Sequence, residues 1–117
     1  MNYFNITEFD SPDQVGSGRV MKQSVLDMLD EARAKFDKSI HINSGYRTAV
    51  HNKKVGGKPN SSHLKGYAVD IHCTASRDRY NLINCLLDVG FNRIGVGNTF
   101  IHVDADPKKD ADVMWTY

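Results

Sequence analysis

The chain of 117 residues has few of the special features that stabilise or locate small proteins. It has only two cysteines, Cys73 and Cys85, which are too few for a disulfide framework and form no CxxC pair. It has no apolar run near the roughly 20 residues of a membrane span. Residues 1–8 show neither the basic nor the apolar region of a secretory signal. The sequence therefore predicts buried free thiols, no signal peptide, synthesis in the cytoplasm and no membrane insertion.

The chain also has almost no excess of charge of one sign. Its 15 basic and 14 acidic residues leave a formal net charge of +1, which excludes an electrostatic case for binding nucleic acid. Hydrophobic residues make up 40% and charged residues 25%, a composition typical of folded domains. A chain of this size buries about two-thirds of its surface on folding. We therefore expect a single domain over residues 1–117.

The hydrophobic pattern predicts an α+β fold, a single small domain with a mainly antiparallel sheet packed with helices. Apolar residues at helical spacing predict three helices, over residues 21–37, 49–55 and 77–89. Short alternating or apolar runs predict four strands, at residues 39–44, 67–73, 92–96 and 99–104. Thr48 and Ser76 are the expected caps of the second and third helices. The apolar residues of segment 113–117 are expected to pack back onto the domain.

The segment 61–70, with the sequence SSHLKGYAVD, contains the first candidate metal ligands. His63 lies at the end of a predicted loop, and Asp70 lies inside a predicted strand. Gly66, between them, permits the turn that would bring His63 back beside Asp70. An imidazole nitrogen and a carboxylate oxygen are both zinc ligands, but two protein ligands do not hold a catalytic zinc ion.

The segment 100–104, with the sequence FIHVD, supplies a third candidate. In a strand, His102 and Asp104 project to one face while Ile101 and Val103 project to the other. With His63, Asp70 and His102 as ligands, a tetrahedral zinc ion would keep its fourth position for water, as catalytic sites do. This pattern predicts a zinc site on one face of the sheet.

Spacing alone leaves other interpretations of these residues open. A histidine in a loop is commonly a surface residue, an aspartate at a strand end can accept bonds from backbone donors, and His102 can be an ordinary sheet residue. A purely structural domain therefore stays open on these grounds. Among the other histidines, His72 shares the strand face of Asp70 but is expected to be exposed. His41 and His51 are expected at the surface.

Three motifs together resemble a known family. The pattern S-x-H-x-x-G-x-A-x-D, preceded by Ser44-Gly45-Tyr46-Arg47 and followed by F-I-H-V-D, is similar to that of the zinc D-alanyl-D-alanine carboxypeptidases. That family includes bacteriophage peptidoglycan endopeptidases, and the resemblance to its small phage-type members covers nearly the whole chain. It implies a zinc metallopeptidase that hydrolyses the stem peptide of bacterial peptidoglycan. It further implies a phage-encoded protein that is either released to the cell wall or carried in the virion. Separately from the resemblance, we expect a monomer.

The resemblance also implies roles for individual residues. His63, Asp70 and His102 match the zinc ligands of the family. Arg47 matches the arginine that faces the substrate carbonyl or terminal carboxylate. Ser61 matches the serine of the motif. Its hydroxyl is expected to form a hydrogen bond either to a residue that supports a zinc ligand or to the substrate. The resemblance leaves open whether the enzyme is a carboxypeptidase or an endopeptidase, and which bond it cuts.

One position departs from the family pattern. Many members have an acidic general base three positions before the last ligand, where this chain has Thr99. Asp104, on the same strand face as His102, is the first candidate for a catalytic base. It is equally a candidate for a carboxylate that orients His102. Thr99 also keeps open a non-catalytic zinc-binding module of the same fold, with a wall-binding or structural role.

Overall fold

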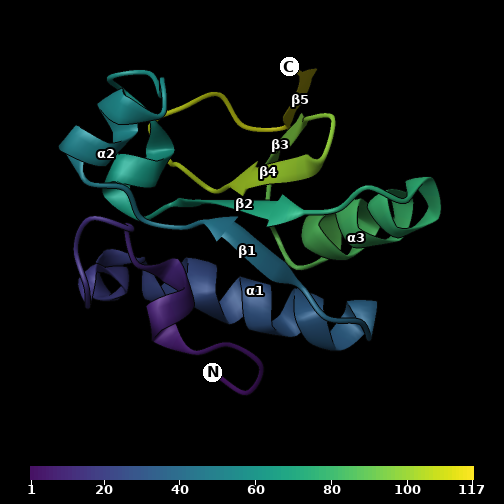
Figure 1. The fold of residues 1–117 in the computed structure, drawn as a ribbon. Helices are drawn as coiled ribbons and strands as arrows, with labels where there is room; N and C mark the ends of the chain where they lie inside the picture. Colours follow the sequence, from purple (N-terminus) through teal and green to yellow (C-terminus); the bar gives the residue numbers. More distant parts are fainter.

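The computed structural model describes residues 1–117 and contains one five-stranded sheet with the strand order β1-β2-β4-β3-β5 (Figure 1). The strands are β1 (His41–Ser44), β2 (Ala68–His72), β3 (Arg93–Val96), β4 (Phe100–Asp104) and β5 (Val113–Thr116). All neighbouring strands are antiparallel except β3 and β5, which are parallel. The predicted α+β fold with a mainly antiparallel sheet is confirmed.

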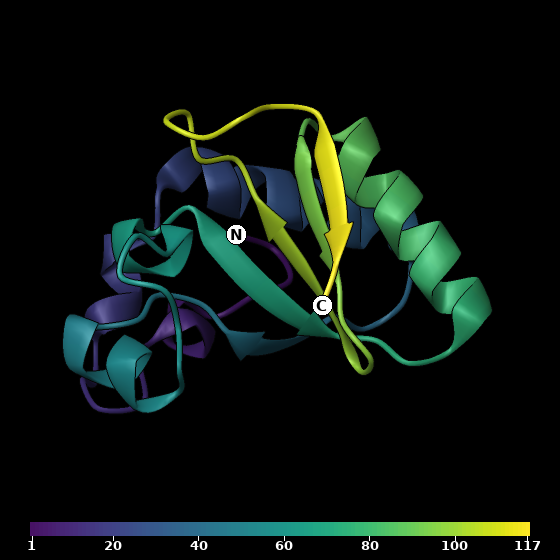
Figure 2. The same ribbon diagram turned by 90° about the horizontal axis from the view of Figure 1, so that it is seen from above.

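Two of the three α-helices cover one face of this sheet. The helices are α1 (Gln23–Phe36), α2 (Ala49–Lys54) and α3 (Ser76–Asp88), and the short 3-10 helices are η1 (Ile6–Phe9), η2 (Ser17–Val20) and η3 (Ser62–Lys65). The helices α1 and α3 pack against each other beneath the sheet, whereas α2 and η3 lie together at its other side (Figures 1 and 2). No helix is long and apolar enough to cross a membrane.

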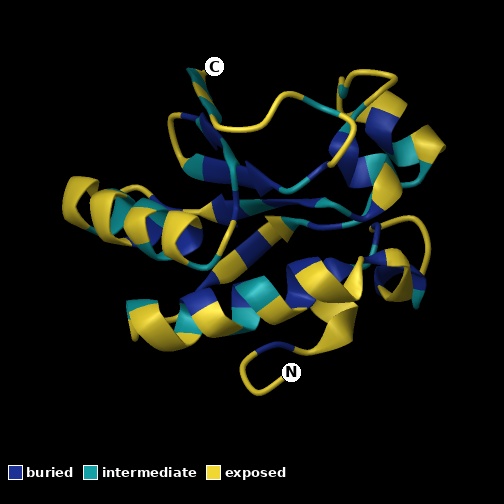
Figure 3. Cartoon of the chain, turned by 180° about the vertical axis from the view of Figure 1, so that it is seen from behind, coloured by how far each residue is buried: buried dark blue, intermediate teal, exposed yellow.

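Alternation along the two central strands divides apolar from polar side chains. In β2 and β4, one face carries the buried residues Val69, Ile71, Ile101 and Val103, which join the hydrophobic core. Asp70 and His102 project to the opposite face, because successive strand residues point to opposite sides. Figure 3 shows buried residues on the central strands and exposed residues on the outer faces of α1 and α3. One face of the sheet is therefore core, and the other is free to carry the site.

Of the two predicted helix caps, Thr48 is confirmed and Ser76 is wrong. Thr48 caps α2, since its Oγ1 accepts a hydrogen bond from the backbone N–H of His51 at 3.1 Å. Ser76 is not the cap of α3: the cap position is Ala75, whose backbone is extended, and Ser76 is the first helical residue. The helix begins one residue early and has no side-chain cap. Both cysteines are free thiols, with Cys73 buried and Cys85 half-buried.

The polar N-terminal segment contributes to the core although its sequence shows no regular period. Phe9 of η1 is fully buried, and its ring lies 5.7 Å from that of Phe4 in an edge-to-face arrangement. The backbone carbonyl of Phe9 accepts a hydrogen bond from Tyr46 N at 2.9 Å. The N-terminal segment is thus hydrogen-bonded to the segment that follows β1.

The turn at Gly66 joins η3 to β2 as the sequence predicts. Gly66 has a φ of 76°, the left-handed conformation that favours glycine, and its carbonyl accepts a hydrogen bond from Lys22 N at 3.0 Å. A Cβ at this position would meet the Val20 carbonyl oxygen and, at 2.9 Å, the Met21 Cα. Position 66 therefore requires glycine for both its conformation and its close packing.

Replacing Gly66 by alanine should lower the free energy of unfolding by more than the same change at Gly56. Gly56 has a similar φ of 78°, but a Cβ there would meet nothing within 4 Å. The left-handed conformation costs alanine about 1–2 kcal/mol at either site. Overpacking should add about 1–3 kcal/mol at Gly66 only. Chemical denaturation of both variants measures the difference, and equal losses would contradict the packing argument.

Candidate metal centre

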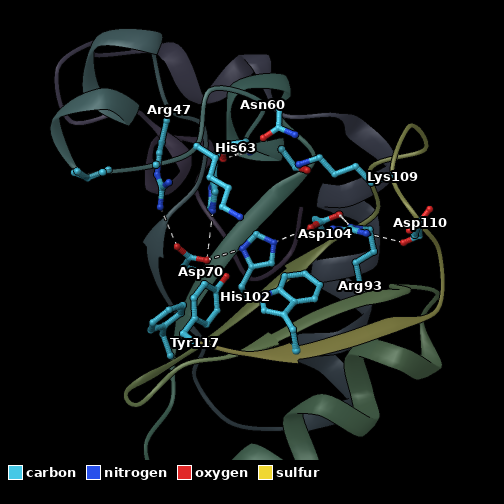
Figure 4. A pocket seen from close by; sticks show the side chains of 18 residues that line it. Arg47, Asn60, His63, Asp70, Arg93, His102, Asp104, Lys109, Asp110 and Tyr117 are labelled. Atoms are coloured by element: carbon cyan, nitrogen blue, oxygen red, sulfur yellow. Dashed lines mark hydrogen bonds and ion pairs between the residues drawn. The ribbon is translucent and has the colours of Figure 1, made fainter.

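Three side chains from three elements meet on the free face of the sheet. His63 comes from η3, Asp70 from β2 and His102 from β4, and their potential ligand atoms all lie within 4.8 Å of one another (Figure 4). Asp70 and His102 are direct cross-strand partners, and the turn at Gly66 brings His63 back over Asp70. The structure thus brings together the three residues that the sequence suggested as ligands.

The His63 ring presents an unpartnered nitrogen to this cluster. Its Nδ1 lies 2.8 Å from the Gly45 carbonyl oxygen, which can only accept, so Nδ1 carries the proton. Its Nε2 is buried without a hydrogen-bond partner and lies 3.4 Å from Asp70 Oδ1. The lone pair of His63 Nε2 therefore faces a lone pair of Asp70 Oδ1 in a buried environment, which is an unfavourable contact. A cation between them would satisfy both, and the carbonyl behind His63 holds the ring in the orientation that a metal ligand needs.

The His102 ring lies between two carboxylates. Its Nδ1 is 3.0 Å from Asp70 Oδ1, and its Nε2 is 2.7 Å from Asp104 Oδ2. Burial alone would lower the pKa of His102, but its hydrogen bonds to Asp104 and Asp70 outweigh burial and raise it. A metal ion on the Asp70 side would replace the Nδ1 proton, while Nε2 kept its proton for Asp104.

Asp70 is the carboxylate that these groups share. Burial would raise its pKa, but the hydrogen bond with His102 and the close approach of the His63 ring hold the pKa well below its usual range. Its second oxygen, Oδ2, lies 3.1 Å from Arg47 Nη2, and both side chains are only 14% exposed. Asp70 is therefore ionised at neutral pH and available as an anionic ligand.

Asp104 lies behind His102 and has both oxygens occupied. Besides the bond of Oδ2 to His102, its Oδ1 accepts from Arg93 Nε at 2.8 Å and from Asp106 N at 3.1 Å. Burial would raise the pKa of Asp104, but the hydrogen bond from His102 and the other donors lower it overall. At 1% exposure it has little access to water. This environment makes Asp104 a good partner for His102 and a weak base.

A cavity of about 830 Å³ opens over these residues. It is lined by Arg47, Val55, Gly56, Gly57, Lys58, Asn60, Ser61, Ser62, His63, Asp70, Arg93, Phe100, His102, Asp104, Lys109, Asp110, Trp115 and Tyr117. Its lining comes from loop 55–61 on one side and from the sheet and the C-terminal segment on the other (Figure 4). The cluster therefore lies in a space large enough for part of a peptide.

An aromatic side chain closes the cavity on the β5 side. The sheet register aligns Asp70, His102, Gly95 and Trp115 in one row across β2, β4, β3 and β5. A Cβ on Gly95 would come within 2.7 Å of the Trp115 indole nitrogen, so the missing side chain leaves room for the ring. The indole lies 5.5 Å from the His102 ring and 5.2 Å from the Arg93 guanidinium. The sequence alone does not predict this wall, because only the sheet register shows that position 95 lies opposite position 115.

The remaining predicted residues are divided between the cavity and the surface. Ser61 lines the cavity, and its Oγ accepts a hydrogen bond from His63 N at 3.2 Å. Thr99 is exposed in the turn before β4 and does not line the cavity. His72 and His41 are exposed cross-strand neighbours at the other end of β2. Neither of these two histidines belongs to the cluster of His63, Asp70 and His102.

Residues 2–104 match the Peptidase M15 family. The chain belongs to this family. The resemblance to the zinc D-alanyl-D-alanine carboxypeptidases, which belong to M15, is confirmed. A search of curated proteins found no match. Membership supports a peptidase, and M15 peptidases depend on a metal ion, which agrees with the clustered donor atoms on the sheet.

Replacing His63 by alanine should abolish stoichiometric metal binding while the fold persists. One of three protein ligands is lost, so metal affinity should fall by more than the ~10–100-fold that removal of an outer hydrogen-bond partner costs. His72→Ala is the matched control, since His72 is exposed and outside the cluster. Metal content after dialysis, with circular dichroism for the fold, checks both variants. Normal metal binding by His63→Ala would remove His63 from the ligand set.

Proposed function

We propose that the protein is a zinc metallopeptidase that hydrolyses peptide bonds of bacterial peptidoglycan. The observation that carries this proposal is the buried His63 Nε2, which faces Asp70 Oδ1 at 3.4 Å with no hydrogen-bond partner, inside the cavity of an M15 chain. His102 Nδ1 completes the donor set. Buried polar atoms without a partner are rare in folded proteins, so the orientation of this atom supports a role in binding a cation.

The donor set supports zinc as the metal ion. Two imidazole nitrogens and one carboxylate oxygen form a common catalytic zinc set, in which a fourth position stays open. Zinc supplies Lewis-acid polarisation of the scissile carbonyl and makes water nucleophilic near neutral pH. The hydrogen bond of His63 to the Gly45 carbonyl and that of His102 to Asp104 would hold both rings in the ligating tautomer.

Arg47 and Ser61 are the proposed substrate-binding residues. Arg47 lines the cavity, where its guanidinium is fixed by bonds to Ser44 Oγ at 2.9 Å, Asn52 Oδ1 at 3.3 Å and Asp70 Oδ2 at 3.1 Å. A fixed cation beside the ligands can stabilise negative charge that develops on a substrate oxygen. Ser61 Oγ accepts one bond from His63 N and keeps its own hydrogen to donate to the substrate.

Hydrolysis adds one water across the amide bond: the carbonyl carbon gains the oxygen, the C–N bond breaks, and the leaving amine gains a proton. We assign Asp104 to orienting His102 rather than to carrying that proton, because both its oxygens are occupied and its pKa is lowered. Besides Asp104 and the proposed ligand Asp70, the cavity is lined by two residues with a titratable side-chain oxygen, Asp110 and Tyr117. These two are the remaining candidates for transferring that proton. The protein would act as a monomer on the stem peptide, released to the cell wall or carried in a virion of the phage that encodes it.

Mass spectrometry of muropeptides before and after digestion tests the function. Zinc-loaded protein should release new peptide fragments from purified peptidoglycan, a chelator should stop the release, and added zinc should restore it. The masses also identify the bond and thus separate carboxypeptidase from endopeptidase activity. The alternative is a non-catalytic module, favoured by Thr99 and by the absence of a free carboxylate beside the ligands. Binding to peptidoglycan without any new fragment would establish that alternative.

Asp104→Asn keeps the shape of the side chain and removes its charge, so it separates the two roles of Asp104. If Asp104 orients His102, metal affinity should fall about 10–100-fold, and hydrolysis should recover at excess zinc. If it were the general base, zinc would stay bound while the rate fell about 10²–10⁴-fold. We expect the first result, measured by zinc titration against a competing chelator and by initial rates at saturating zinc.

A further inference from the structure

Lys109 is an unpaired cation in the wall of the cavity, on the loop between β4 and β5. Its side chain is half-buried and reaches into the cavity toward the loop that carries Asn60 (Figure 4). Burial is the largest influence on its pKa, which is lowered. Partial burial of an ammonium group without a partner costs desolvation free energy. An anionic ligand would offset this free energy by pairing with the charge.

The charged groups around Lys109 are already paired with one another. Asp104 is bonded to Arg93 at 2.8 Å, and Asp106 lies 3.4 Å from Lys65 Nζ. Their effects on Lys109 oppose each other, since the two carboxylates raise its pKa and the two cations lower it. The side chain of the next residue, Asp110, is exposed and forms no ion pair with Lys109. Among these groups, Lys109 is thus the one cation that has no carboxylate partner.

The loop that carries Lys109 is held in place by its own hydrogen bonds. Asp106 is buried; its Oδ2 accepts from Ser62 Oγ at 2.8 Å, its Oδ1 accepts from Lys108 N at 3.1 Å, and its carbonyl accepts from Lys109 N at 3.3 Å. On the far side of Lys109, the Asp110 carbonyl accepts from Arg93 Nη1 at 2.6 Å. The backbone that carries the Lys109 side chain is therefore fixed before any ligand arrives, which lowers the entropy cost of binding.

The charge of the whole cavity favours an anion. Four cationic and three carboxylate side chains line it, and a bound divalent metal ion would add two positive charges. Arg47 is bonded to Ser44, Asn52 and Asp70, and Arg93 is bonded to Asp104 and the Asp110 carbonyl. The cations with no partner are Lys109 and Lys58, and Lys58 is exposed. A solvated lysine contributes less than a half-buried one, so Lys109 is the stronger site.

We propose that Lys109 is a specificity-determining residue that binds a free carboxylate of the peptide substrate. This inference rests on the proposed function, since it assumes that the cavity takes a peptide. The carboxylate belongs either to the C-terminus of the peptide or to an acidic side chain within it. Either source presents the same chemistry to the ammonium group, and the experiment separates the two.

The test measures binding to the metal-free protein, so that hydrolysis does not contribute. The probe is the N-acetylated pentapeptide L-Ala–D-Glu–L-Lys–D-Ala–D-Ala in three forms: with both carboxylates free, with a C-terminal carboxamide, and with the glutamate carboxylate converted to a carboxamide. The one tryptophan of the chain, Trp115, lines the cavity and reports binding through its fluorescence. The wild-type protein should bind the free form about tenfold more tightly than one of the two amides, and that amide identifies the source.

Three variants assign this preference to Lys109. Lys109→Met should bind the free form and the identifying amide equally, because the ammonium charge is gone while the length is kept. Lys109→Arg should retain most of the preference. Lys108→Met is the matched control: Lys108 carries the same charge one position away, is exposed, does not line the cavity and makes its bond to Asp106 through the backbone. It should behave as the wild type.

The outcomes separate this inference from the proposed function. A preference that survives in Lys109→Met, or that is lost equally in Lys108→Met, overturns the role of Lys109 even where the protein digests peptidoglycan. The same holds if the wild-type protein binds all three peptides equally. Conversely, a carboxylate preference that depends on Lys109, in a protein that releases no muropeptides, supports the binding site and overturns the peptidase proposal.

Discussion

The Asp70 carboxylate is the fixed charge around which the site is arranged. It lies in the middle of β2, only 14% exposed, and contacts Arg47, His63 and His102. A carboxylate at that depth is costly unless donors and cations surround it. Here they come from the β1–α2 connection, from η3 and from β4, so the burial of Asp70 requires these three segments to meet. The fold and the candidate metal centre thus have one electrostatic requirement in common.

The parts of the site that follow from local rules could be predicted from the sequence. Strand alternation places Asp70 and His102 toward one face, and a glycine at position 66 supplies the left-handed turn that returns His63 to them. Alternation does not, however, say which residues of two strands lie opposite each other. The pairing of Asp70 with His102, on which the cluster depends, is set by register across the whole sheet.

The parts that depend on distant segments could not be predicted in this way. Phe9 belongs to a polar segment without a hydrophobic period, and only its packing against Phe4 and its bond to Tyr46 show that it is core. The wall made by Trp115 depends on the absence of a side chain at Gly95, twenty residues earlier in the chain. The failed cap at Ser76 is different: the residue type is suitable, but the backbone becomes helical one position too soon.

The hydrogen bonds of the N-terminal segment have a consequence for how the molecule opens. Tyr46 N bonds to the Phe9 carbonyl, Lys22 N to the Gly66 carbonyl, and Arg47 N to the His63 carbonyl. These bonds connect residues 1–22, the segment after β1 and η3, so we expect the three segments to open together in local unfolding. Occupation of the cluster at His63 would therefore slow amide hydrogen exchange not only beside the ligands but also back into η1 and η2, which line no part of the cavity.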